Sequence, residues 1–415
     1  MRIAMLSYHT CPLATLGGKD TGGMNVYVRD LTRELGRRGI GVDVFTRSQD
    51  EHVPHVLHDL GYGNRIVHIA AGPEVPLPRE ELSQHLEIFR QGILAFADAK
   101  SIRYDLIHAH YWLSGLVGLE LRKAWGLPLI QMFHTLGVMK NRVARSASEI
   151  EPEERVEAEK RLLREADRVV AATQAELAQI QWLYQVPTDN VVVIPPGVDT
   201  ARFYPIPQDE AKEYAGVPED RHLILFVGRI APLKGIDTLL EAIGLLCEQG
   251  FLDAVPIAVA VIGGEPDASR DELSAAMQSL ERFCEERGLK EIVRFLGRRD
   301  QDSLPYYYSA ADVVVVPSHY ESFGLVALEA MACGRAVVAS ETGGLAFLIR
   351  DGETGFHVPA GDPSALAGRL IELLSDRKLM ERMGKEACAY AGQFAWPLIA
   401  DRILDLYGQM TPKYA

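Results

Sequence analysis

The sequence is poor in cysteine and lacks long uninterrupted apolar runs. Its five cysteines are an odd number among 415 residues, lie far apart and include no Cys-x-x-Cys pair, so neither a disulfide framework nor a zinc site is expected. No apolar run approaches the roughly 20 residues that a membrane-spanning helix needs, and residues 1–7 lack the longer apolar core of a signal peptide. We therefore expect a soluble, cytoplasmic protein without a membrane span.

An excess of positive charge is also absent. The 43 lysines and arginines are outnumbered by 57 aspartates and glutamates, which gives a formal net charge of −14. Such a chain repels phosphate backbones and anionic membrane surfaces, so no nucleic acid is expected as a partner. Because a single core stops growing near ~250–300 residues, the length favours two domains.

Short apolar runs alternate with segments whose apolar residues recur at helical spacing. The runs lie near 3–7, 42–46, 66–70, 105–109, 128–133, 168–172, 190–194, 223–227, 257–262, 292–296, 312–316 and 336–339. This rhythm predicts an α/β fold of two doubly wound, Rossmann-like domains, with ligands at the carboxyl ends of the strands and between the domains. It breaks into prolines near 195–222, so we place an N-terminal domain over 1–200, a C-terminal domain over 201–395, and over 396–415 a helix returning to the first domain.

A glycine-rich segment, 17–23, separates the first strand from its helix. Glycines allow close approach of the backbone to an anion, and the following helix start offers free N–H groups. The segment is neither Gly-x-Gly-x-x-Gly nor a Walker loop, so it either contacts a phosphate or sugar phosphate or is a plain flexible turn.

Two further segments follow strands of the second half. Arg229 and Lys234 come after the strand at 223–227, where cations can hold a diphosphate; the alternative is two surface cations near a turn. After the strand at 312–316, Gly324 should open a helix with Glu321 before it and Glu329 inside it. These carboxylates can accept hydrogen bonds from sugar hydroxyls, or can simply favour the helix start.

Histidines follow two strands of the first half. His110 and Tyr111 come after one strand, and His134, Thr135 and Lys140 after the next. No carboxylate or cysteine has the spacing of a known metal site, so no metal is expected. Because His134 ends an apolar strand, we expect it to orient a sugar.

The glycine-rich segment, the segment GRIAPLKG at 228–235 and the segment ESFGLVALE at 321–329 together resemble the retaining glycosyltransferases of the GT-B fold, in family 4. This family includes sucrose-phosphate synthases and the mycothiol-pathway glycosyltransferase. The resemblance spans nearly the whole chain and implies a hexosyltransferase that uses a nucleotide sugar as co-substrate. It implies no obligatory cofactor, an indirect role for magnesium at most, and a monomer or weak homo-oligomer.

The resemblance also implies roles for matching residues. The implied catalytic set has four members. Arg229 and Lys234 contact the diphosphate, and His134 and Glu321 contact the transferred sugar. The donor-binding set is Gly22, Gly23, Arg294, Phe295, Ser322, Phe323, Gly324, Leu325, Val326 and Glu329. Within it, Glu329 corresponds to the ribose ligand, and the backbone at 294–295 to the segment that contacts the base.

Family members that act on a phosphorylated acceptor surround its phosphate with polar and cationic residues. The matching positions are Asn25, Arg79, His110, Tyr111, Thr135, Lys140 and Arg155. Three cations suit a dianionic phosphate. The alternative is that Arg79 and Arg155 pair with acidic neighbours on solvated helix starts, namely Glu80, Glu81, Glu151, Glu153 and Glu154.

The resemblance leaves two acceptor molecules as alternatives. The element from His134 to Lys140 is similar to that of sucrose-phosphate synthases, whereas 22–27 and 110–115 look more like the mycothiol enzyme; Met24 departs from the former and Arg79 from the latter. The resemblance favours glucose transfer from UDP-glucose to fructose 6-phosphate, giving sucrose 6-phosphate. The alternative is N-acetylglucosamine transfer from its UDP-sugar to inositol phosphate, and the weaker rivals are a nucleotide-sugar epimerase and an inactive nucleotide-sugar sensor.

Overall fold

The computed structural model describes residues 1–14, 22–264 and 275–411. The described residues form two compact units: unit 1 contains 1–14, 22–197 and 396–411, and unit 2 contains 198–264 and 275–395. The division falls after Gly197, slightly before the boundary expected at 200, and again before Trp396. Within the described residues, no helix is long and apolar enough to cross a membrane.

The described part of unit 1 contains an eight-stranded sheet in the order β3-β4-β2-β1-β5-β6-β7-β8. Its strands are β1 (Arg2–Leu6), β2 (Gly41–Arg47), β3 (Val56–Leu57), β4 (Arg65–Ile69), β5 (Leu106–His110), β6 (Leu129–Met132), β7 (Arg168–Ala171) and β8 (Val191–Val193). Neighbouring strands are parallel except β3, which pairs antiparallel with β4. The order reverses between β1 and β5, and such switch points are where doubly wound sheets bind ligands.

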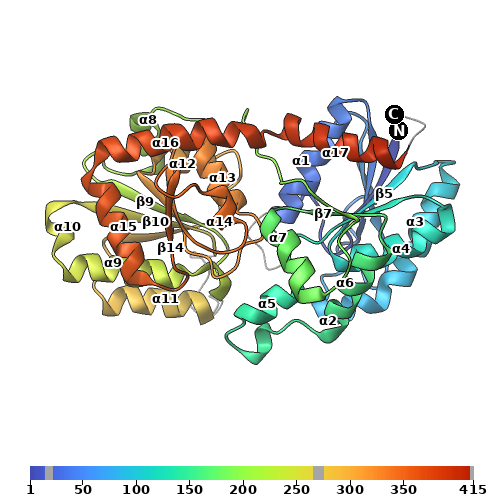
Figure 1. Cartoon of the computed structure of the whole chain (residues 1–415), viewed down its shortest axis with the longest axis horizontal. Coiled ribbons are helices and arrows are strands. Elements are labelled where there is room, and N and C mark those ends of the chain that lie inside the picture. Colours follow the sequence, from blue (N-terminus) through green and yellow to red (C-terminus); the bar gives the residue numbers. More distant parts are fainter. Residues whose placement is uncertain (15–21, 265–274, 412–415) are drawn as a thin grey trace. The chain divides into compact units, whose positions relative to one another are not determined.

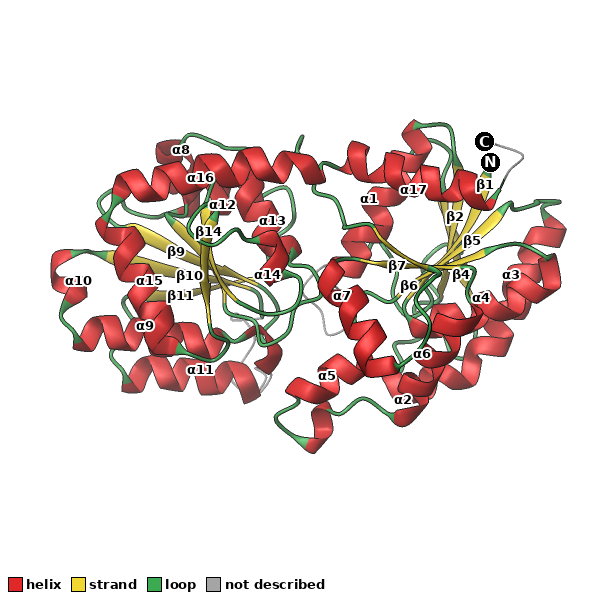
Figure 2. Ribbon diagram, viewed as in Figure 1, coloured by secondary structure: helices red, strands yellow, loops and turns green. Residues whose placement is uncertain are grey.

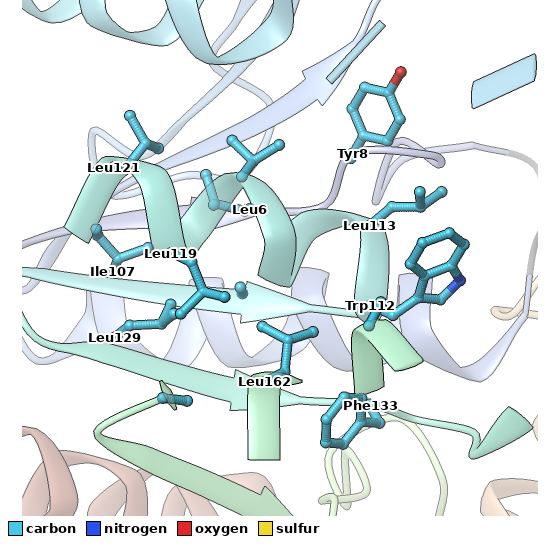
Figure 3. Packing of buried hydrophobic residues seen from close by; sticks show 14 of the residues in the cluster. Leu6, Tyr8, Ile107, Trp112, Leu113, Leu119, Leu121, Leu129, Phe133 and Leu162 are labelled. Carbon is cyan, nitrogen blue, oxygen red and sulfur yellow. The ribbon is translucent and has the colours of Figure 1, made fainter. Parts of the chain in front are cut away.

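Helices cover both faces of this sheet (Figure 2). They are α1 (Gly23–Arg37), α2 (Arg79–Leu82), α3 (Leu86–Ala99), α4 (Trp112–Trp125), α5 (Gly137–Val143), α6 (Glu153–Glu165), α7 (Gln174–Gln179) and α17 (Trp396–Met410). The last helix, α17, packs against α1 (Figure 1). On the side of α4, apolar residues of the strands and of α4 and α6 form one core, which includes Ile107, Leu119 and Leu162 (Figure 3).

The described part of unit 2 contains a six-stranded, wholly parallel sheet in the order β11-β10-β9-β12-β13-β14. Its strands are β9 (His222–Val227), β10 (Ile257–Ile262), β11 (Val293–Gly297), β12 (Val313–Val316), β13 (Ala336–Ser340) and β14 (Gly355–Val358). Its helices are α8 (Gln208–Ala215), α9 (Ile236–Glu248), α10 (Phe251–Ala254), α11 (Ala275–Glu286), α12 (Leu304–Ala310), α13 (Leu325–Ala332), α14 (Leu345–Leu348), α15 (Pro363–Ser375) and α16 (Arg377–Ala391). The switch point lies between β9 and β12.

The expected α/β class with two Rossmann-like units is confirmed. Every apolar run that predicted a strand corresponds to one, because parallel strands covered on both faces are apolar throughout. The sequence analysis missed β3 and β14. β3 has only two residues, and β14 begins with glycine, so neither stands out as an apolar run.

Candidate active site

The loops that follow β9 and β12 touch at the switch point of unit 2. The backbone N–H of His319, after β12, donates to the carbonyl oxygen of Leu233, after β9, over 2.9 Å. Gly235 permits this approach, because its φ is +65° and a Cβ there would lie 2.0 Å from the carbonyl oxygen of Pro317. A side chain at 235 would therefore push the two loops apart.

This loop contact brings Lys234 onto Glu321. Lys234 ends the short helix η4 (Pro232–Lys234), and its Nζ donates to Glu321 Oε2 over 2.5 Å. The two side chains are only 23% and 18% exposed, so solvent screens the pair incompletely. Arg229 is half-buried earlier in the same loop. Two cations and a carboxylate beside neighbouring strand ends have the chemistry to hold a diphosphate and a sugar hydroxyl.

The segment after Glu321 opens helix α13 with unpaired backbone donors. Gly324 precedes the helix with a φ of +105°, and no side chain caps the first turn. Of the residues expected to bind the donor here, Leu325 and Val326 are half-buried at the helix start, as is Ser322, whereas Phe323 is buried. The free N–H groups of the first turn are suited to an anion.

Glu329 lies within α13 and the pair Arg294–Phe295 on β11, whereas Lys234 and Glu321 lie in the loops after β9 and β12. Glu329 is only 7% exposed, and its Oε2 accepts a hydrogen bond of 2.8 Å from the hydroxyl of Tyr308 on α12. Burial raises the pKa of that tyrosine, so it stays a donor. Arg294 is exposed and Phe295 half-buried on β11, an edge strand separated from β9 by β10. Their contact with ribose and base stays a prediction.

In unit 1, histidines gather at the ends of β5 and β6. Nδ1 of His110 and Nε2 of His134 lie 2.9 Å apart, and the ring of Tyr27 packs on both at 5.2–5.5 Å. Nδ1 of His108 lies 2.7 Å from the hydroxyl of Tyr407 on α17. Burial lowers the pKa of His134 and of His108 to about 3, so both rings are neutral near pH 7. His134 therefore offers a hydrogen bond rather than a charge.

Arg155 of α6 lies at the centre of the residues expected to bind acceptor phosphate. It is 1% exposed, and its guanidinium donates to the carbonyl and hydroxyl oxygens of Thr135 over 2.8 and 3.0 Å. It also donates to the hydroxyl of Tyr111 over 3.1 Å and to Glu159 over 2.8 Å. Tyr111 and His134 have positive φ values of 75° and 63°, a strained conformation that often marks binding sites.

Glu151, one of the acidic neighbours named in the sequence analysis, joins the three expected cations. Its carboxylate lies 2.9 Å from the guanidinium of Arg155, pairs with Lys140, and lies 4.0 Å from the guanidinium of Arg79. The alternative of pairing with acidic neighbours therefore holds for Glu151. For Arg79, 45% exposed at the start of α2, the solvated helix start also holds, whereas Arg155 is buried and Glu151 is only 10% exposed. We call Arg79, Tyr111, Thr135, Lys140 and Arg155 the acceptor cluster.

Asn25 makes internal hydrogen bonds, whereas only one ring nitrogen of His110, Nδ1, makes a contact; its buried Nε2 has no hydrogen-bond partner among the described residues. The amide nitrogen of Asn25 donates to Thr10 and to the carbonyl oxygen of Cys11, both over 2.7 Å, and its oxygen accepts from the N–H of Gly22 over 2.9 Å. Both residues are buried, and their contact with the acceptor stays a prediction. Gly22 and Gly23 begin α1, whereas the remainder of the glycine-rich segment, 17–21, lies outside the described residues.

Two residues in these networks, Glu159 and Tyr308, were missed by the sequence analysis. Glu159, fully buried, accepts from the backbone N–H of Gly137 over 2.9 Å as well as from Arg155. The hydroxyl of Tyr308 donates to Glu329. A carboxylate four residues after Arg155 on one helix is a pairing signal that could have identified Glu159. In the described residues, no group of three or more histidine, cysteine, aspartate or glutamate side chains is placed to hold a metal.

Comparisons with known proteins agree with this architecture. Residues 21–202 match the family "Glycosyltransferase Family 4", and residues 207–389 match "Glycosyl transferases group 1". The D-inositol 3-phosphate glycosyltransferase of Thermomonospora curvata is 40% identical over 98% of this chain and 95% of its own; that of Actinosynnema mirum is 41% identical over 98% and 97%.

Solved structures show the same fold. The sucrose-phosphate synthase of Thermosynechococcus elongatus is 36% identical, with a TM-score of 0.89 over 99% of each chain. The Anabaena protein Alr3699/HepE, solved with UDP-glucose, is 21% identical, with a TM-score of 0.75 over 99% of this chain and 100% of its own.

Two parallel-sheet units of this kind, each with cationic or polar loops at its switch point, define a GT-B enzyme. The chain belongs to the family 4 glycosyltransferases and is a hexosyltransferase.

Proposed function

We propose that the enzyme transfers N-acetylglucosamine from UDP-N-acetylglucosamine to an inositol phosphate, with retention at the anomeric carbon. The acceptor cluster carries this proposal, because it gathers a buried arginine, a lysine, a second arginine and two hydroxyls. A neutral acceptor would not need them, whereas a phosphate dianion accepts a hydrogen bond from each.

The names of the relatives in Thermomonospora and Actinosynnema support inositol phosphate as the acceptor. They favour the alternative of the sequence analysis over its leading hypothesis. Fructose 6-phosphate with UDP-glucose stays the second candidate, because a sucrose-phosphate synthase is 36% identical over nearly the whole chain. Both reactions place a phosphorylated polyol in the acceptor cluster.

The donor side is proposed to be the switch point of unit 2. Arg229 and Lys234 would face the diphosphate, the first turn of α13 would face one of its oxygens, and Glu321 would accept from a sugar hydroxyl. A neighbour of this fold was solved with UDP-glucose, and uracil is therefore the base we propose. His134, neutral by burial, would bind a hydroxyl of the transferred sugar.

The proposed transfer follows a front-face route. The bond between the anomeric carbon and the leaving phosphate oxygen breaks, the acceptor oxygen bonds to the same face of that carbon, and its proton moves to the leaving oxygen. Arg229 and Lys234 would stabilise the charge that develops on the diphosphate, which is the main electrostatic demand of the step. No side-chain nucleophile is then required.

The test is UDP release together with identification of the product. Each of UDP-N-acetylglucosamine and UDP-glucose is paired with D-inositol 3-phosphate, fructose 6-phosphate, inositol or fructose. The proposal predicts turnover with UDP-N-acetylglucosamine and inositol phosphate. Turnover confined to UDP-glucose and fructose 6-phosphate would replace it by the second candidate, and turnover confined to unphosphorylated acceptors would refute both.

A further inference from the structure

The cations proposed to bind acceptor phosphate are already bound to an anion of the protein itself. Lys140 of α5 and Arg155 of α6 pair with the carboxylate of Glu151, and the guanidinium of Arg79, on α2, lies 4.0 Å from it (Figure 1). A carboxylate has the charge sign and the planar pair of acceptor oxygens that guanidinium groups recognise in a phosphate. Glu151 thus occupies the position that the acceptor phosphate needs.

The charges at this position do not accommodate both anions. Among five of the described side chains, Arg79, Lys140 and Arg155 contribute three positive charges, while Glu151 and Glu159 contribute two negative ones. These five side chains together carry one net positive charge. Adding a phosphate dianion to them would give one net negative charge beside the buried Arg155, whereas replacing Glu151 by that dianion leaves the sum at zero. The summed charge therefore favours a phosphate that replaces the carboxylate of Glu151 over one that binds beside it.

The remaining contacts of Arg155 stay in place when Glu151 leaves. Glu159 holds its Nε over 2.8 Å, and Thr135 and Tyr111 hold its other nitrogens over 2.8–3.1 Å. Glu159 is fixed in turn by the backbone N–H of Gly137. The guanidinium is therefore oriented for an incoming phosphate without help from Glu151.

The backbone of Glu151 is held separately from its side chain. Asn141 accepts from the N–H of Glu151 over 2.6 Å, and the Asn141 amide donates to the Glu151 carbonyl oxygen over 3.3 Å. This double contact fixes the backbone, so a rotation of the side chain alone can withdraw the carboxylate.

We propose that Glu151 occupies the acceptor-phosphate position in the free enzyme and that the phosphate group of the acceptor displaces its carboxylate. The inference rests on the proposed function and names the residue that sets acceptor selectivity. A dianion attracts the three cations more strongly than a single carboxylate does, whereas a neutral polyol cannot compete. Glu151 thereby lowers the affinity for every acceptor and excludes those without a phosphate.

The test replaces Glu151 by its neutral isostere, Glu151→Gln, and measures binding of inorganic phosphate by calorimetry. If Glu151 occupies the position about nine-tenths of the time, its removal strengthens phosphate binding roughly tenfold. The KM for the phosphorylated acceptor falls by a similar factor, while the KM for the UDP-sugar is unchanged. Glu154→Gln, three residues further on and exposed, removes the same charge from the segment and serves as control.

Weaker or unchanged phosphate binding by Glu151→Gln would overturn the inference, because Glu151 would then position the cations or contribute nothing. If this variant does not fold, Asn141→Ala, which frees the backbone of Glu151, is expected to strengthen phosphate binding as well. Because inorganic phosphate is the probe, failure of inositol phosphate as a substrate would refute the proposed function without touching this result.

Discussion

Replacing Lys234 by alanine removes the cation that contacts Glu321. The structure gives two separable consequences of Lys234→Ala. The first is the loss of the 2.5 Å ion pair, whose side chains are 23% and 18% exposed. Such a partly shielded pair contributes on the order of 1 kcal/mol to stability, so the midpoint of thermal unfolding should fall by only a few degrees.

The second consequence concerns the chemical step. A cation aimed at a developing negative charge in a shielded site contributes roughly 3–4 kcal/mol, which is about a 10²–10³-fold effect on rate. We therefore expect kcat to fall by that factor while the fold is retained. Since Glu321 loses the same partner, Lys234→Ala and Glu321→Ala should be strongly non-additive when combined.

The assay is UDP release at saturating donor and acceptor, with thermal unfolding measured in parallel. Lys290→Ala is the matched control, because Lys290 is also in unit 2 and pairs with a glutamate over 2.6 Å but is 69% exposed. The Lys290→Ala variant should release UDP at the wild-type rate. Near-wild-type turnover by Lys234→Ala would refute the reasoning, as would loss of activity explained by unfolding.

Three further predictions concern acceptor binding, pH and loop packing. Arg155→Lys keeps the charge but loses the forked contacts to two hydroxyls, so KM for the acceptor should rise about 10–100-fold with donor KM unchanged; equal rises would contradict this. His108, whose pKa burial lowers to about 3, takes up a proton more readily when unfolded, so stability falls as pH drops below 6.5. In the His108→Gln variant, the midpoint of thermal unfolding should fall less steeply as pH drops. An unchanged pH dependence would contradict the lowered pKa of His108. Gly235→Ala places a Cβ 2.0 Å from a carbonyl oxygen and should cut turnover at least as much as Lys234→Ala; full activity would show that the loops need not touch.

Much of the fold could be predicted because its signals are local. The run from 223 to 227 is apolar throughout, and only a strand covered on both faces needs that pattern. Tyr27, Leu31 and Leu35 recur at helical spacing, and all three are buried on α1. The short strand β14 was missed because four residues beginning with glycine carry too weak a pattern.

The site could be predicted only as a set of residue types. Cations and carboxylates at strand ends were visible in the sequence, but the Lys234–Glu321 contact joins positions 87 residues apart and depends on loops that meet through Gly235. Likewise, the sequence offered Glu151 only as one of five acidic neighbours of Arg79 and Arg155, and the fold brings it onto Lys140 of α5 as well. Burial of Asn25 is also a tertiary property, and its internal hydrogen bonds to Thr10 and Cys11 could not be read from its local motif.

The most direct test of the central claim, a phosphorylated acceptor, is the ratio of kcat/KM for inositol phosphate to kcat/KM for inositol with one UDP-sugar. Several charge-assisted hydrogen bonds at roughly 1.5–3 kcal/mol each correspond to a preference of about 10³-fold or more. The account predicts a ratio of that size, or the same ratio for fructose 6-phosphate over fructose if the second candidate holds. Ratios near one for both pairs would contradict the account.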